Sequence, residues 1–481
     1  MVQRWPIATL ILLALPFQWA FVANDTSFAL KPVHFVMLFC LMLSPILMFK
    51  VRQSDMRENV YILLGFPGLY ALYCFSSTWA YIPHRGMVLG LREFAYLALA
   101  IGAYFAFAVS TPFRIARGAL LSFIVGMAGL ALAVVVVLTL HGISVVGVVK
   151  AALVGDGAGL QVAVFKRFFN LVSGADSTNE EVSSAFRHGQ LIALMIPWFI
   201  AAVLLPWRGG GLRTVVFVVA TIGLVGLVVL SLSRSALLVL AALFAVLTAG
   251  AVARGLTQTQ GVAMAVAATA GIIGLVYLAS LPNFADLAAR QLGDDIVNNP
   301  RLSIVAQSSD QLSRHFWFGA GAGTEVIVGA DRFYIHNFAL HFFHQTGVAG
   351  LILAVTVQLL ILVKAARHGL RALTHRGDPE VAAVSLVVTG LLGIVLIRMQ
   401  VSGGGLLNAP EWVSLALALA QAYHWRPVVV ARQTPEADAA PPRFAPPGPA
   451  PAGYRYAPRR PELAAPSIDP EMRRAIARVA R

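Results

Sequence analysis

Apolar residues in this chain gather into repeated runs of roughly 18–24 residues, the length of a helix that crosses a bilayer. In hydrocarbon every backbone amide must be paired within the structure, and these runs are too long for the strands of a barrel. The pattern predicts an all-α polytopic integral membrane protein with about twelve transmembrane helices. The predicted spans are residues 6–23, 32–49, 60–78, 87–110, 118–140, 189–206, 214–231, 236–253, 261–280, 337–363, 381–397 and 411–425.

The short segments between these runs differ in charge from one side to the other. If the N-terminus is cytoplasmic, the outer short loops carry only Lys31, His84 and Arg85. By the positive-inside rule, this asymmetry predicts that both termini are cytoplasmic and that the first run is an uncleaved helix. The basic residues of the inner loops are Lys50, Arg52, Arg57, Arg114, Arg117, Arg208, Arg213, Arg254, Lys364, Arg367, Arg371 and Arg376.

Composition supports the membrane interpretation and divides the chain into two parts. Hydrophobic residues make up 58% of the sequence and charged residues 12%, unlike a soluble domain. We expect a transmembrane domain over 1–426 and a Pro-rich, basic, disordered cytoplasmic tail over 427–481. The net charge of +14 reflects topology and anionic lipid headgroups. No nucleic-acid-binding motif accompanies it, so no nucleic-acid partner is expected.

Two predicted outer loops, about 141–188 and 281–335, are too long to be simple connections. The first ends in Arg187 and His188, at the start of a span, and the second contains Arg301 and Arg314. Arg234 lies between two apolar runs joined almost without a linker, in SLSRSALL. Such an arginine either binds an anion in a cavity or only extends to the interface to close the helical hairpin, and the sequence favours neither reading.

Arginine suits phosphate because its planar fork offers paired donors and stays charged at any working pH. Arg187, Arg234 and Arg301 share one predicted membrane face, although only the fold can bring them together. Other ionisable residues within spans are sparse. Arg92-Glu93, and Arg398 near a span end, form no evident pathway through the membrane.

His336, followed by Asn337, stands where the second loop enters a helix. An imidazole titrates near neutrality, so it can take a proton from an attacking hydroxyl, but a lone histidine there is more often a polar interfacial group. His341 and His344 are three residues apart and raise a metal hypothesis. Aromatic residues surround them and no acidic residue is near in sequence, so no metal site is predicted. The glycines of FGAGAGT at 318–324 lack a full nucleotide-binding fingerprint and predict a tight surface turn.

Five motifs follow one another along the chain: FRHG at 186–189, SLSRSALL at 231–238, NPRLS at 299–303, HFWFGAGAG at 315–323 and HNFALHFFHQTGVAGL at 336–351. In this order they resemble the O-antigen ligase and Wzy-type polymerase family of bacterial envelope glycosyltransferases. The span count and the large outer loop before the third-last helix also agree. One departure is Gln345-Thr346-Gly347, where many members have Glu-x-Gly.

The resemblance implies a metal-independent, inverting glycosyltransferase without a cofactor, in the bacterial inner membrane. It would move a glycan from undecaprenyl diphosphate to a hydroxyl of lipid A–core oligosaccharide on the periplasmic face. His336 would be the general base, and Arg187, Arg234 and Arg301 would bind the diphosphate. His188 and Arg314 would support them, and Asn337 would orient the imidazole or, more often for this residue type, cap the helix.

Three alternatives remain open from the sequence. Within the family, the chain could polymerise O-antigen or exopolysaccharide. Transfer of an oligosaccharide to protein is less favoured, because we expect the C-terminal tail to be cytoplasmic and not an appended outer domain. From another class, a twelve-span secondary transporter would place polar residues and broken helices at the midplane and often contain repeated halves. The sequence shows no internal repeat, and its polar residues gather at one predicted face.

Overall fold

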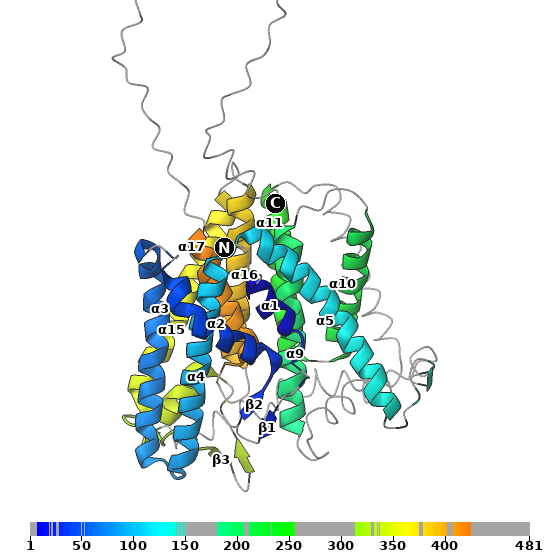
Figure 1. The fold of residues 1–481 in the computed structure, drawn as a ribbon. Coiled ribbons are helices and arrows are strands. Elements are labelled where there is room, and N and C mark those ends of the chain that lie inside the picture. The colour runs from blue at the N-terminus through cyan, green and yellow to red at the C-terminus, as the bar shows by residue number, and fades with distance from the viewer. Residues whose placement is uncertain are drawn as a thin grey trace, which may run out of the picture. The chain divides into compact units, whose positions relative to one another are not determined.

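The computed structural model describes most of the first compact unit, 1–425, and nothing of the second unit, 426–481. Figure 1 shows the described helices and strands. The described residues are 7–18, 20, 23–25, 28–49, 51, 53–140, 142, 144, 146–147, 150, 180–205, 211–231, 233–254, 313–328, 331–333, 335, 337–374, 379–401 and 407–424.

The described part of the chain is mainly helical, as predicted. Two short antiparallel strand pairs, β1 with β2 and β3 with β4, are its only sheets. The elements are α1 (Ile7–Ala14), β1 (Ala23–Asp25), β2 (Phe28–Leu30), α2 (Pro32–Met48), α3 (Gln53–Ser76), η2 (Ser77–Trp79), α4 (Pro83–Ala108), α5 (Pro112–Leu140), α9 (Glu180–Leu204), α10 (Leu212–Leu230), α11 (Arg234–Arg254), β3 (Val326–Val328), β4 (Asp331–Phe333), α15 (Phe338–Thr374), α16 (Pro379–Val401) and α17 (Ala409–His424).

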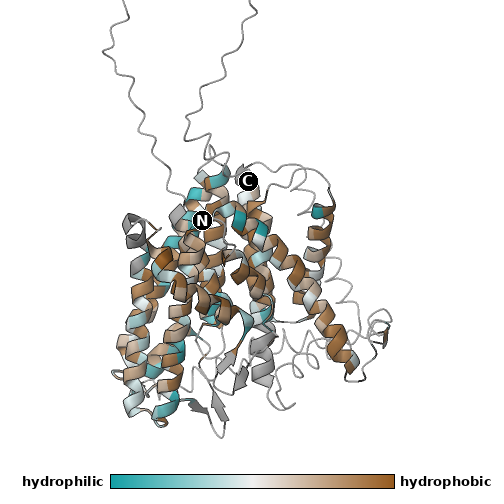
Figure 2. Ribbon diagram, in the orientation of Figure 1, coloured by the Kyte–Doolittle hydropathy of each residue, from teal (hydrophilic) through white to brown (hydrophobic). Residues whose placement is uncertain are grey.

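Six described helices are long and apolar enough to cross a bilayer: α4, α5, α10, α11, α15 and α16. Figure 2 shows that apolar residues dominate these helices. The finding supports a polytopic membrane protein, while the total of twelve spans stays a prediction. The predicted span at 261–280 and the predicted tail lie outside the described residues.

Two predicted boundaries are wrong. The first run, predicted as a span over 6–23, is helical over Ile7–Ala14, and its described residues after Ala14 are not helical, because Pro16 has no N–H to donate and restricts the residue before it. The predicted outer loop at 141–188 ends earlier than expected, since α9 already begins at Glu180. Arg187 and His188 therefore belong to a helix. The first turns of α9 are acidic and polar, so the hydropathy pattern did not identify them as part of the helix.

The most buried of these six helices is α16, which packs against α9, α11, α15 and α17 (Figure 1). On the other side of α15 lies α3, and α3 packs in turn against α4. The last turn of α16 and the first turns of α11, α15 and α17 come together at one end of these helices, as the hydrogen bonds of the candidate site show.

One irregularity of the fold lies in α15, which is broken at Gly347 (φ 72°, ψ −160°). The glycine segment before the helix, 315–325, fills the break. Ala320 N donates to His344 O at 2.7 Å, Gly321 N to Gln345 O at 3.0 Å, and Val348 N to Phe316 O at 2.9 Å. Main-chain groups that lose their helical partners at the break are thus paired without water, as a membrane protein requires.

Positive φ angles at Gly319, Gly321 and Gly323 (71°, 91° and 77°) let this segment lie against its neighbours. A Cβ on Gly319 would overlap the backbone at Gln345 and Thr346. The predicted turn is therefore present, but the prediction of a surface position is wrong, since these glycines are buried. The sequence pattern identified the flexibility of the glycines but not the helix break that they accommodate.

Candidate active site

The hairpin between α10 and α11 is built by its serines. Ser233 N donates to Ser231 Oγ at 3.1 Å, and Ser233 Oγ accepts from Ala236 N at 3.2 Å. Ser233 therefore caps α11, the role for which serine is favoured before a helix. The cap places Arg234 and Ser235 in the first turn of α11. Arg234 is exposed and Ser235 is buried.

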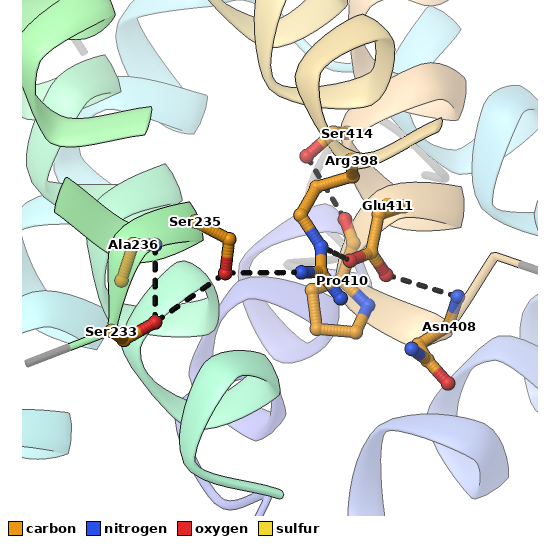
Figure 3. Close-up of polar contacts among 8 residues, drawn as sticks. All are labelled: Ser233, Ser235, Ala236, Arg398, Asn408, Pro410, Glu411 and Ser414. Atoms are coloured by element: carbon orange, nitrogen blue, oxygen red, sulfur yellow. Dashed lines mark hydrogen bonds and ion pairs between the residues drawn. The ribbon is translucent and has the colours of Figure 1, made fainter. Parts of the chain in front are cut away.

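Ser235 contacts a buried ion pair between α16 and α17 (Figure 3). Arg398, in the last turn of α16, donates through Nε to Glu411 Oε1 at 2.7 Å and through Nη1 to Ser235 Oγ at 3.4 Å. The side chains of Arg398 and Glu411 are 2% and 0% exposed. A buried guanidinium is costly unless it is paired, so this interaction locks three helix ends together.

Glu411 is itself fixed by the start of α17. Its Oε2 accepts from Asn408 N at 3.0 Å, and Trp412 N donates to Asn408 O at 3.1 Å. A carboxylate in the first turn that reaches back to the residue before the helix satisfies one of the unpaired amides there. One Glu411 oxygen thus caps α17 while the other binds Arg398.

The start of α15 is joined to the same turn of α16. Asn337 Oδ1 accepts from Leu340 N at 3.0 Å, so Asn337 caps the helix, one of the two roles considered for it. Its Nδ2 donates to Gln400 Oε1 at 2.5 Å. Arg398 and Gln400 lie two residues apart. The end of α16 therefore contacts both the hairpin that carries Arg234 and the helix start that carries Asn337.

Among the predicted site residues, the structure describes the side chains of Arg234, Asn337 and Arg314. Arg314 is exposed in the segment before the glycines. His336 and Arg301 lie outside the described residues, as do the side chains of Arg187 and His188. Convergence of the three arginines therefore remains a prediction.

The departure from Glu-x-Gly has a structural role. Gln345 is buried, its Oε1 accepts from Thr324 N at 3.1 Å, and its Nε2 donates to Thr324 O at 2.5 Å. An amide side chain can accept one hydrogen bond and donate another at the same time, whereas an ionised carboxylate can only accept. Gln345 thus holds the glycine segment in the helix break.

The histidines behind the metal hypothesis pack among aromatic and amide groups. His341 stacks on Tyr73 with ring centroids 6.0 Å apart, and His344 Nδ1 lies 3.0 Å from Gln345 Nε2. Within the described ranges no group of three His, Cys, Asp or Glu side chains is close enough to hold a metal ion.

A further cation, Lys31, lies at the start of α2. Its Nζ donates to Gln18 Oε1 at 3.0 Å, its backbone N to His34 Nδ1 at 3.2 Å, and its charge interacts favourably with Glu411. Burial lowers the pKa of Lys31 from 10.5 to about 8, and Glu411 offsets part of that effect. The charged ammonium is costly to desolvate, so Lys31 loses its proton at a lower pH than an exposed lysine does.

The site residues that sequence reasoning missed are Ser235, Gln400 and Glu411, and Arg398 was set aside. A signal was present, because an arginine at the end of one apolar run and a glutamate at the start of the next are natural partners inside a membrane. They are 13 residues apart, and the glycines of the intervening sequence, Gly403–Gly405, give no indication of how the two helix ends meet.

Comparison with known proteins matches residues 216–355 to the family model of O-antigen ligases. The matched range includes the α10–α11 hairpin, the glycine segment and the first half of α15. It confirms the family resemblance inferred from the sequence motifs. A search of curated proteins gave no match.

Proposed function

We propose that this chain, of which residues 216–355 match the family model of O-antigen ligases, is an O-antigen ligase of the bacterial inner membrane. It transfers a glycan from undecaprenyl diphosphate to a hydroxyl of lipid A–core oligosaccharide, with the site facing the periplasm. The observation that carries the proposal is the junction at the last turn of α16. That turn contacts both the Arg234 hairpin and the capped start of α15, next to His336.

In this mechanism each group has one role. His336 accepts the proton of the acceptor hydroxyl as its oxygen attacks carbon-one of the donor sugar. The bond from carbon-one to the diphosphate breaks, and the electron pair leaves with the diphosphate. Arg234, with Arg187 and Arg301, stabilises the charge that develops there. Direct displacement inverts the configuration at carbon-one, and His188 and Arg314 support the arginines.

Deletion of the gene tests the function through the surface polysaccharide. A ligase leaves core-only lipopolysaccharide and accumulated lipid-linked polymer. Core bearing a single repeat unit would instead indicate a polymerase, and unchanged polysaccharide with an uptake defect would indicate a transporter.

Complementation of the deletion strain tests the residues. His336→Ala is expected to abolish transfer while His84→Ala, a change at an exposed histidine outside the site, preserves it. Arg234→Ala is expected to weaken donor use, with Arg367→Ala at an exposed position as its control. Normal transfer by His336→Ala would refute the base assignment. Activity that a chelator removes and a divalent ion restores would revive the metal hypothesis.

A further inference from the structure

The guanidinium of Arg398 connects three helices through two contacts. Its Nε–H binds Glu411 of α17 at 2.7 Å and its Nη1–H binds Ser235 of α11 at 3.4 Å. Glu411 cannot shift freely, because its second oxygen accepts from Asn408 N. The guanidinium therefore offers Ser235 a donor whose position is fixed from the opposite side (Figure 3).

Ser235 follows Arg234 directly in the first turn of α11. Successive side chains on a helix point about 100° apart, and here Ser235 is buried while Arg234 is exposed. The hydrogen bond from Arg398 to Ser235 thus holds this turn from outside and, with it, the direction in which Arg234 projects. The Ser233 cap fixes where the helix begins, and Ser233 Oγ, 3.4 Å from Ser235 Oγ, holds the same side chain from within the hairpin.

We propose that Arg398 and Ser235 are positioning residues that aim Arg234 at the diphosphate of the donor, an inference that rests on the proposed function. The last turn of α16 is then the common support of both halves of the reaction. Arg398 sets the phosphate-binding hairpin, and Gln400, through Asn337, sets the helix start next to the base. Neither Arg398 nor Ser235 needs to contact the substrate.

Ser235→Ala is the sharpest test, because it removes the hydroxyl that contacts Arg398 and Ser233 and leaves the Arg398–Glu411 ion pair intact. The expected result is about a tenfold loss in kcat/KM for donor, the effect of a weak hydrogen bond to a charged group. Ser235→Thr keeps the hydroxyl and is expected to restore most of the loss. The matched control is Ser414→Ala, a buried serine whose Oγ donates to Pro410 O within its own helix. Thermal unfolding of both alanine variants is expected to be similar.

A double-mutant cycle separates positioning from general stability. If Ser235 acts through Arg234, Ser235→Ala costs nothing further in the Arg234→Ala background. Transfer is measured with purified protein, lipid-linked glycan from the deletion strain as donor and core-only lipopolysaccharide as acceptor. Wild-type kinetics for Ser235→Ala, or the same loss with and without Arg234, would overturn the positioning role. Normal kinetics for Arg234→Ala would instead refute the phosphate-binding role on which the inference rests.

Discussion

Gly347→Ala tests whether the break in α15 depends on the glycine segment packed into it. Gly347 has φ 72° and ψ −160°, a region that is essentially restricted to glycine and costs other residues about 1–3 kcal/mol. The added Cβ would also overlap the main-chain carbonyl of Trp317. Neither the helix nor the segment can keep its present place without strain.

The second part of the cost comes from the hydrogen bonds across the break. If the segment moves away, up to three main-chain bonds weaken, including Val348 N to Phe316 O, each contributing about 0.5–1.5 kcal/mol. Strain and lost bonds together predict a loss of about 3–5 kcal/mol in the free energy of unfolding. That is a large share of the stability of a typical domain.

Thermal unfolding in detergent measures the effect, with Gly393→Ala as the matched control. A Cβ at Gly393 in α16 meets nothing within 4 Å, and alanine is the better helix former, so this variant is expected to be neutral or slightly stabilised. Gly347→Ala should melt several degrees lower. Equal melting of the two variants would show that the break does not depend on glycine, and the proposed role of the segment would fail.

Three further predictions concern buried polar groups. Glu411→Ala leaves Arg398 buried without its ion-pair partner and should lower the free energy of unfolding by about 3–5 kcal/mol. The double variant Arg398→Met with Glu411→Leu should lower it much less. Equal losses of stability in thermal unfolding would argue against a buried ion pair. Gln345→Glu should lower the melting temperature at neutral pH, because the ionised side chain cannot donate to Thr324 O, and unchanged melting at pH 7 would contradict this. The folded pKa of Lys31, about 8, lies below its ordinary 10.5, so the unfolded chain binds more protons between these values and stability should rise with pH across that window. Lys31→Met should remove this rise, and a rise that persists would assign it to another group.

The sequence predicted the helical class because long apolar runs satisfy their backbone bonds internally wherever they lie in the membrane. The predicted helix boundaries were wrong in two places. Pro16 ends α1 at Ala14, inside an apolar run. The first turns of α9 are polar, so a hydropathy window does not include them in the helix.

The sequence identified some residues of the candidate site, but it did not predict which of them contact one another. Arg234 was identified because it stands between two apolar runs joined almost without a linker, and Asn337 because it stands where the second long loop enters a helix. The contacts that their two helix starts make with the end of α16 were not predicted. The role of Arg398 becomes evident only when it is paired with Glu411, and a single sequence does not show which helix ends meet. Gln345 appeared to be a lost carboxylate until its two bonds to Thr324 were seen.

The glycine segment also constrains the order in which the protein can be assembled. Gly323 N donates to the hydroxyl of Tyr73, and Trp79 Nε1 donates to Gly319 O, contacts that span 250 and 240 residues of sequence. The α3–α4 hairpin is synthesised long before its partner, since chains emerge from the N-terminus first. The break in α15 closes only when residues 315–325 meet both that early hairpin and the helix that follows them. The end of the molecule that holds the glycine segment is therefore completed late in biogenesis, against helices that are synthesised first.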